Sequence, residues 1–343
     1  MPGDADLHES VEETAEDIAT METRGAATIA AAAADALAAQ ARAVDADDPD
    51  AFRATMRAAG RRLYDTRPTA VSLPNSLRYV LGRMEGDTVH DVRAAVTTAA
   101  ADFAERLDTA QDELGEIGAN RLRDGDTILT HCHSTDALSC VRAAVEQGKE
   151  LSAIVKETRP RRQGHITASE LREMGVPVTL VVDSAARRYL DETDHVVVGA
   201  DAIAADGSVI NKIGTSGLAV NARERGVPIM VAAQTIKLHP DTLTGHTVEI
   251  EMRDEAEVIS AEERAEIGEV TVENPAFDVT PPRYLDAIVT ESGQFPPESV
   301  VTLMRELFGE SATRPWEVQE SAASADDRAG LADVEPDGGA ERP

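Results

Sequence analysis

Apolar residues recur at helical spacing through the first third of the chain and in short unbroken runs after it. From about Val11 to Asp124 the spacing predicts helices throughout, with no β-branched alternating run between them. After the polar stretch Arg123 to Asp126 the pattern changes to short apolar strands separated by helical segments. A helical N-terminal region is therefore joined to an α/β region.

The α/β region alternates strands and helices in a regular order. Strands are predicted at residues 126–132, 150–158, 176–183, 195–201 and 227–233, with helices at 134–148, 167–175, 184–191 and 216–226. Strands that are apolar along their whole length are typical of a parallel sheet covered on both faces. We predict a Rossmann-like, doubly wound parallel sheet, which binds ligands at the C-terminal ends of its strands.

Changes in composition suggest where the chain divides. We expect an acidic N-terminal arm at 1–20, a helical domain at 21–124, a Rossmann-like catalytic domain at 125–310 and a disordered acidic tail at 311–343. The tail is rich in Ala, Asp, Glu, Gly and Pro, and it has almost no apolar periodicity.

The charge of the chain limits the kinds of partner that it is expected to bind. The net charge of -30 argues against binding a nucleic-acid backbone or an anionic membrane, so small molecules and other subunits are the expected partners. Only four basic residues are lysines and twenty-nine are arginines, as expected of a protein adapted to very high salt. We also find no apolar stretch of membrane-spanning length and no signal peptide, which indicates a cytoplasmic protein.

A cysteine lies where a predicted strand turns into a helix. Cys132 is placed at that helix N-terminus, where backbone N–H groups favour a thiolate or a substrate phosphate. Around it lie hydrogen-bonding groups that a core cysteine does not need, from His131, His133, Ser134, Thr135 and Asp136. The alternative, a small buried apolar residue, suits Cys140 in the same helix better.

An aspartate ends another predicted strand. Asp201 either caps a backbone turn or acts chemically. The turn beyond it contains Asn211 and Lys212 and leads through Gly214 and Thr215 into a further helix N-terminus. This predicts a second anion site with one of the rare lysines beside it.

Further positive charges extend the same interpretation. Arg24 opens an alanine-rich helix, and Gly25, Ala26 and Ala27 would let a phosphate approach the backbone closely. Arg67 precedes a proline in an extended segment, although either arginine taken alone suits the surface. Together with Lys212, Lys237 and two helix N-termini, they supply enough positive charge for a substrate with two phosphates.

Several ordered motifs carry a family resemblance. The stretches RGAATIA, TRPTAVSL, THCHS, VKETRPRRQG, VVVGADAI, NKIGTSGLA, VPIMVAAQTIK and NPAFDVTPPRYLDAIVTESG occur in that order between about Met21 and Gly309. The chain resembles the superfamily of methylthioribose-1-phosphate isomerase, archaeal ribose-1,5-bisphosphate isomerase and the regulatory alpha, beta and delta subunits of the translation-initiation guanine-nucleotide exchange factor.

The resemblance implies a function. Catalytic members have a cysteine and an aspartate that match Cys132 and Asp201, and the Cys-His-Ser sequence here is similar to the ribose-1,5-bisphosphate isomerases. It implies conversion of ribose 1,5-bisphosphate to ribulose 1,5-bisphosphate in archaeal nucleoside and AMP degradation, without metal or redox cofactor, with Cys132 as base and Asp201 as acid. It also suggests a nucleotide activator and a homo-oligomer, dimer-based or hexameric.

Two alternatives remain open at this point. A non-enzymatic regulatory subunit could be built on the same fold. A methylthioribose-1-phosphate isomerase would need an apolar pocket for its methylthio group, where Arg24, Arg67 and Lys237 suit a phosphate instead.

Overall fold

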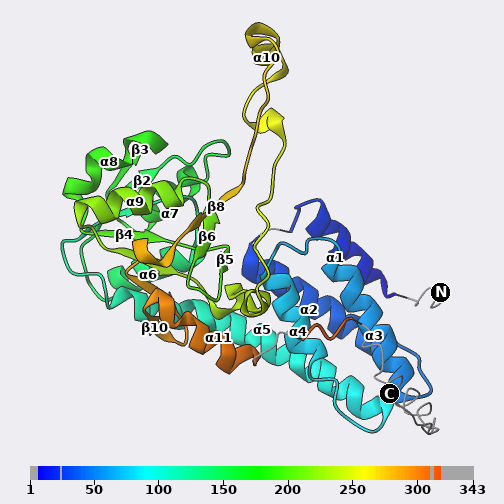
Figure 1. Ribbon diagram of the computed structural model, residues 1–343. Helices are drawn as coiled ribbons and strands as arrows, with labels where there is room; N and C mark the ends of the chain where they lie inside the picture. Colours follow the sequence, from blue (N-terminus) through cyan, green and yellow to red (C-terminus); the bar gives the residue numbers. More distant parts are fainter. Residues whose placement is uncertain (1–6, 24, 310–312, 318–343) are drawn as a thin grey trace, which may run out of the picture.

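The N-terminal region of the folded chain is a bundle of helices (Figure 1). The computed structural model describes residues 7–23, 25–309 and 313–317. The helices of the bundle are α1 Glu9–Ala19, α2 Ala26–Ala43, α3 Pro49–Tyr64, α4 Ser72–Leu81 and α5 Val89–Ala119. Side chains cap three of them at the N-terminus: His8 accepts from a backbone N–H group at the beginning of α1, Asp48 does so at α3 and Thr88 at α5. Within the described ranges no helix is long and apolar enough to cross a membrane.

Helix α1 corrects the expectation of an acidic arm at residues 1–20. Its exposed side is acidic, but Val11, Ala15 and Ile18 are fully buried in the core of the bundle. Apolar positions spaced by three and four residues put these side chains on one face of a helix. The segment is therefore an integral part of the helical region from Glu9 onward.

The second half is built on a mostly parallel sheet. All five predicted strands form within their predicted ranges, as β1 Thr127–Thr130, β2 Ser152–Lys156, β3 Val178–Val181, β4 His195–Val198 and β7 Ile229–Ala232. Two further strands, β9 Ala287–Thr290 and β10 Gly293–Phe295, extend the sheet. Its order over the described residues is β10-β9-β7-β4-β1-β2-β3, and only β10 runs antiparallel to its neighbour.

Helices cover both faces of this sheet, which confirms the predicted doubly wound fold. They are α6 Thr135–Glu146, α7 Gly164–Glu173, α8 Ala186–Tyr189, α9 Thr215–Arg225 and α11 Val300–Phe308. Successive strand residues enter different cores: Val196 and Val198 pack with α8, α9 and α11, whereas Val197 packs with α5, α6 and α7. The predicted helix at 184–191 is broken into short 3-10 and α-helical turns.

Helix α5 belongs to both halves of the molecule. Its N-terminal part packs in the bundle core and its C-terminal part packs against α6 and the sheet. The helices approach closely because a Cβ at Gly118 would lie only 2.2 Å from the Cys140 sulfur. The two halves therefore share a continuous 31-residue helix, whereas the sequence predicts a boundary at residue 124.

A smaller antiparallel sheet and a long excursion complete the fold. The sheet consists of β5 Ala202–Ile203, β6 Val209–Lys212 and β8 Phe277–Thr280. The excursion before β8 projects from the body and carries α10, Ala261–Ile267 (Figure 1). Short 3-10 turns are η1 Asp183–Ala185, η2 Leu190–Glu192, η3 Thr235–Lys237, η4 Pro240–Thr244, η5 Glu255–Glu257, η6 Pro282–Tyr284 and η7 Pro297–Ser299.

The beginning of the expected tail is part of the helical core. Trp316 is only 1% exposed, and its ring centre lies 5.1 Å from that of Tyr64 in α3. Its carbonyl oxygen accepts a 2.6 Å hydrogen bond from the Arg61 guanidinium. Residues 313–317 therefore correct the predicted start of the tail at 311, and residues 318–343 lie outside the described chain.

Candidate active site

The central pair of strands places Cys132 and Asp201 at one edge of the sheet. Strand β1 lies beside β4, and the chain leaves β1 toward β2 on one side but leaves β4 toward β7 on the other. Ligands bind at such a reversal of strand order, beyond the carboxyl ends of the strands. Cys132 follows β1 and Asp201 follows β4, close enough for the Asp201 charge to affect the Cys132 pKa.

The backbone at Cys132 is held in an unusual conformation. Its φ is 69°, in the left-handed region that costs a non-glycine residue about 1–2 kcal/mol. Its N–H donates to Thr158 Oγ1 at 2.9 Å, and its carbonyl accepts from Thr167 Oγ1 at 2.8 Å. The sulfur lies 3.5 Å from Gln163 Oε1, to which the thiol donates. These contacts fix the direction of the thiol.

Burial disfavours the thiolate of Cys132, which is one of the two anions that the sequence predicts at this helix N-terminus. Helix α6 begins only at Thr135, behind the cap that Ser134 makes with the Ala137 N–H. Burial raises the pKa of Cys132 to about 11, although the Lys212 ammonium acts to lower it. Desolvation of the charged sulfur therefore outweighs the favourable charges around it.

Asp201 is exposed to solvent, but neighbouring protein groups still displace part of the water around its carboxyl. Its carboxyl makes no hydrogen bond within the described ranges, so it does not cap a turn, and only its backbone N–H is engaged, with the Ile210 carbonyl at 2.9 Å. The surrounding protein displaces enough water to raise the pKa of Asp201 above its ordinary value, against the opposing effect of four cationic side chains. These are Lys237, Lys212, Arg253 and Arg67.

Two of these cations share an aromatic ring. Lys212 ends β6, is 6% exposed, and places its ammonium 4.6 Å from the centre of the Phe277 ring. The Arg253 guanidinium lies 5.7 Å from the same ring. Lys212 forms no ion pair with any described residue, so its charge is available to an anion.

The other two cations are paired with carboxylates. Arg67 binds Glu251 at 2.7 Å, and Arg253 binds the second oxygen of that carboxylate at 3.1 Å, so two guanidiniums share one negative charge. Lys237 binds Asp136 at 2.7 Å. The Asp136 side chain is 1% exposed and accepts from the Gln234 amide as well, which leaves only its backbone N–H for a substrate.

The predicted helix N-termini differ in availability. At α6, Thr135 is exposed, and Ser134 caps the Ala137 N–H. At α2, Gly25 has a φ of 91°, Ala26 and Ala27 follow it, and no side chain caps the helix; Arg24 lies outside the described residues.

The N-terminus of α9 corrects the predicted second anion site. Both oxygens of Asp278 already accept hydrogen bonds there, from the N–H groups of Gly214 at 2.7 Å and Ser216 at 3.0 Å. Asn211 is buried and donates to Thr215 Oγ1 at 3.0 Å. Asn211 therefore shapes the turn, whereas Lys212, at the end of β6, supplies positive charge beside it.

Comparison with known proteins identifies the chain at this point. Residues 22–297 match the Initiation factor 2 subunit family. The chain belongs to this family. A relative named ribose 1,5-bisphosphate isomerase, from Haloferax volcanii, is 70% identical over 310 residues, covering 90% of this chain and 96% of that protein. The predicted relationship is therefore confirmed.

Other members of the Initiation factor 2 subunit family are more distant. A methylthioribose-1-phosphate isomerase from Syntrophotalea carbinolica is 40% identical, covering 81% of this chain and 86% of that protein. A solved structure described as translation initiation factor eIF-2B, from Pyrococcus horikoshii, superposes with a TM-score of 0.73 at 31% identity, covering 86% of this chain and all of that one. Proteins with different names therefore share this fold, so the fold alone does not identify a function.

Sequence reasoning assigned no role to Lys156, Gln163 or Arg253 at this family's sheet edge, and it named His131 only as a hydrogen-bonding neighbour of Cys132. Lys156 ends β2, is 3% exposed, and donates to the Gly214 carbonyl at 3.3 Å. His131 donates from Nε2 to the Ile213 carbonyl at 2.8 Å, and burial lowers its pKa to about 4, so the ring is neutral. The scarcity of lysine could have identified Lys156, whereas no pattern marked Gln163 or Arg253.

Proposed function

We propose that this protein converts ribose 1,5-bisphosphate to ribulose 1,5-bisphosphate. The observation that supports this most is the pairing of Cys132 and Asp201 at the reversal of strand order, with four cationic side chains around the carboxyl. A regulatory subunit would need neither the thiol nor the isolated carboxyl. The name of the 70% identical relative supports the same reaction.

The proposed chemistry needs one base and one acid. A phosphate on C1 prevents the sugar ring from opening to a free aldehyde, so the C1–O4 bond must break while O4 receives a proton from Asp201. Cys132 removes the proton from C2, and the electron pair left behind forms the C1=C2 bond of a cis-phosphoenolate. Return of a proton to C1, with loss of the C2 hydroxyl proton, gives the ketone. Each proton transfer of this kind contributes about 10²- to 10⁴-fold to the rate.

The pKa shifts favour the proposed acid, Asp201, in its neutral form and disfavour the proposed base, Cys132, in its thiolate form. The raised pKa of Asp201 favours its neutral carboxyl, the form that can donate. The raised pKa of Cys132 disfavours the thiolate, and Lys212 is the nearby charge that most favours it. Lys212 therefore has two proposed tasks, which are to stabilise the base and to bind a phosphate.

The charges at the site favour a bisphosphate over a methylthio sugar. Lys212 is unpaired among the described residues, and the Arg67, Glu251 and Arg253 group has one excess positive charge. Buried charges of this kind need an anionic partner, because their desolvation is costly. A methylthio group would offer them none.

Turnover of two substrates tests the proposal. In molar KCl, we expect ribose 1,5-bisphosphate to be converted with a kcat/KM about 10- to 10²-fold above that for methylthioribose 1-phosphate, since a charge-assisted pair is worth roughly 1.5–3 kcal/mol. The Cys132→Ser protein, purified in the same way, controls for a contaminating isomerase. Preference for the methylthio sugar would move the chain to that activity, and inactivity on both would favour the regulatory alternative.

A further inference from the structure

Lys237 lies on a segment with little regular structure of its own. Lys237 is the last residue of η3, and its ammonium donates to the Asp136 carboxylate at 2.7 Å. The only strand-like pairing of this segment, among the described residues, is an isolated bridge between Leu238 and Ile203. The position of the ammonium therefore depends on side chains that hold the segment from outside.

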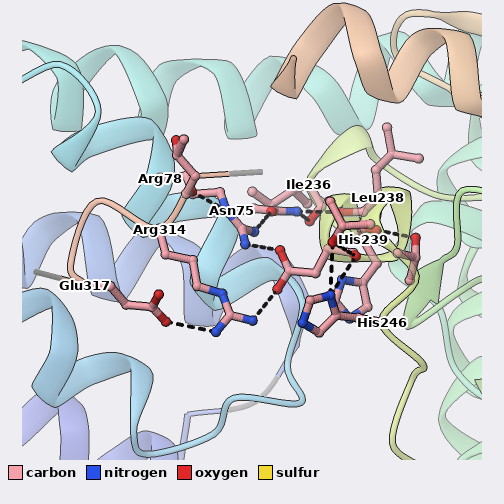
Figure 2. A network of polar contacts seen from close by, with 12 residues as sticks. Asn75, Arg78, Ile236, Leu238, His239, His246, Arg314 and Glu317 are labelled. Carbon is pink, nitrogen blue, oxygen red and sulfur yellow. Dashed lines mark hydrogen bonds and ion pairs between the residues drawn. The ribbon is translucent and has the colours of Figure 1, made fainter. Parts of the chain in front are cut away.

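One buried side chain holds the backbone on both sides of Lys237 (Figure 2). Asn75, in α4, donates its two amide hydrogens to the carbonyl oxygens of Ile236 at 2.8 Å and Leu238 at 2.7 Å. The residue is 2% exposed, and its Oδ1 accepts from Arg78 at 2.9 Å. Both amide hydrogens are used, and the Arg78 contact fixes the orientation of the amide.

A second anchor lies four residues further along. Asp241 accepts hydrogen bonds from both Arg78 and Arg314, the latter at 2.8 Å. Arg314 also binds Glu317 at 2.9 Å, and Arg78 donates to the Thr313 carbonyl at 3.1 Å. The C-terminal segment 313–317 is therefore connected to the Lys237 segment through the same arginines.

We propose that Asn75 is a positioning residue for Lys237, with the Arg78, Asp241 and Arg314 network as its support. The inference rests on the proposed function, together with the prediction from the sequence that Lys237 contacts a substrate phosphate. Fixing the carbonyls before and after Lys237 restricts its main chain, and a small displacement of a binding group is costly in a preorganised site. A helix of the N-terminal bundle would thereby contribute to the site on the sheet without touching the substrate.

A substitution that keeps the shape of Asn75 tests this. Asn75→Asp retains the size of the side chain but removes both donors, leaving two carbonyls opposite an acceptor. The matched control is Ser76→Ala, because Ser76 is also buried in α4 but donates only to Leu73 in the same helix, at 2.8 Å. We expect KM for ribose 1,5-bisphosphate to rise about tenfold in Asn75→Asp and less than about twofold in Ser76→Ala.

Coupling to Lys237 separates positioning from general stability. In a Lys237→Ala background, Asn75→Asp should raise KM by less than about twofold, because the group it positions is gone. A tenfold increase in both backgrounds, or an unchanged KM in folded Asn75→Asp, would overturn the proposal. Should Asn75→Asp not fold, Arg314→Gln takes its place in the same cycle, with an expected increase of about threefold that also vanishes without Lys237.

Hydrogen exchange provides a reading that needs no substrate. Amides of residues 234–241 should exchange faster in Asn75→Asp, or in Arg314→Gln, than in the parent and in Ser76→Ala. Unchanged exchange in the folded variant refutes positioning whatever the substrate is. Failure of the parent to convert the bisphosphate would instead count against the proposed function.

Discussion

Burial and neighbouring charge act in opposite directions on the ionisation of Cys132. Burial raises the pKa of its thiol to about 11, and Lys212 is the first of the charges that act in the opposite direction. At pH 8 the thiolate is then about one part in a thousand, whereas an ordinary cysteine with a pKa near 8.5 is about one-quarter ionised. Substrate-free protein should therefore behave as if Cys132 were an unreactive thiol.

Alkylation by iodoacetamide, followed by mass spectrometry of the separate cysteine peptides, measures this directly. Because only the thiolate reacts, the rate at Cys132 should rise about tenfold per pH unit between pH 8 and 10 and level off near pH 11. An ordinary thiol would level off near pH 9. The position of the plateau does not depend on access of the reagent, which scales the whole curve.

Removing the neighbouring charge should move that plateau in a known direction. Lys212→Met eliminates a cation that favours the thiolate, so the pKa of Cys132 should rise and alkylation at pH 9 should slow further. Lys149→Met is the matched control, since the Lys149 ammonium binds the Ala119 carbonyl at 2.7 Å and is not among the charges acting on the thiol. A plateau at or below pH 9 in the parent, or one that Lys212→Met leaves unmoved, would refute the reasoning.

Three further outcomes are expected. Cys132→Ser should fold normally and lose at least ~10²-fold in turnover, whereas Cys140→Ser should keep its activity, because Cys140 is buried against α5; equal losses measured by steady-state kinetics would contradict the role of Cys132. Asp201→Asn should lower kcat more than it raises KM, and a raised KM alone would make Asp201 a binding residue. Trp316→Ala should lower the free energy of unfolding by about 3–5 kcal/mol in urea titrations at molar KCl, and a loss below about 1 kcal/mol would show that residues 313–317 are not part of the core.

The strands of the main sheet could be predicted because burial on both faces produces an unbroken run of apolar residues in the sequence. A strand such as β4 is apolar from Val196 to Val198, since Val196 and Val197 enter opposite cores and neither can be polar. The same logic fails at the edge of the sheet, where β10 has only one neighbour and contains Gln294. It also fails for β5, which is two residues long.

Packing between segments that are far apart in the sequence could not be predicted from local patterns of apolar residues. Trp316 is a single aromatic residue in an acidic stretch, so no periodicity distinguishes it from a tail. Its contacts lie in α3, and the Arg61 that binds its carbonyl is 255 residues away in the chain. Such a residue is buried only if a core formed by distant segments has space for its ring.

The candidate site was predicted where a residue follows a strand and missed where it arrives from a loop. Cys132 and Asp201 follow β1 and β4, so parallel-sheet geometry alone brings them to one edge. Arg253 comes from the long excursion before β8, which has no periodic pattern to place it. Asp278 was missed for a different reason, because its capping of α9 depends on which strand pairs with β6.

Lysine usage shows how composition can still indicate a site. Three of the four lysines are buried or nearly so, with Lys156 3% exposed, Lys212 6% exposed and the Lys237 side chain 11% exposed. Selection for a highly hydrated acidic surface acts on exposed lysines, which arginine or an acid can replace. A buried ammonium is harder to replace, because the planar guanidinium is larger and has a different donor geometry. Lysines that remain in such a chain are therefore concentrated where a compact buried cation is needed, and here that place is the carboxyl edge of the sheet.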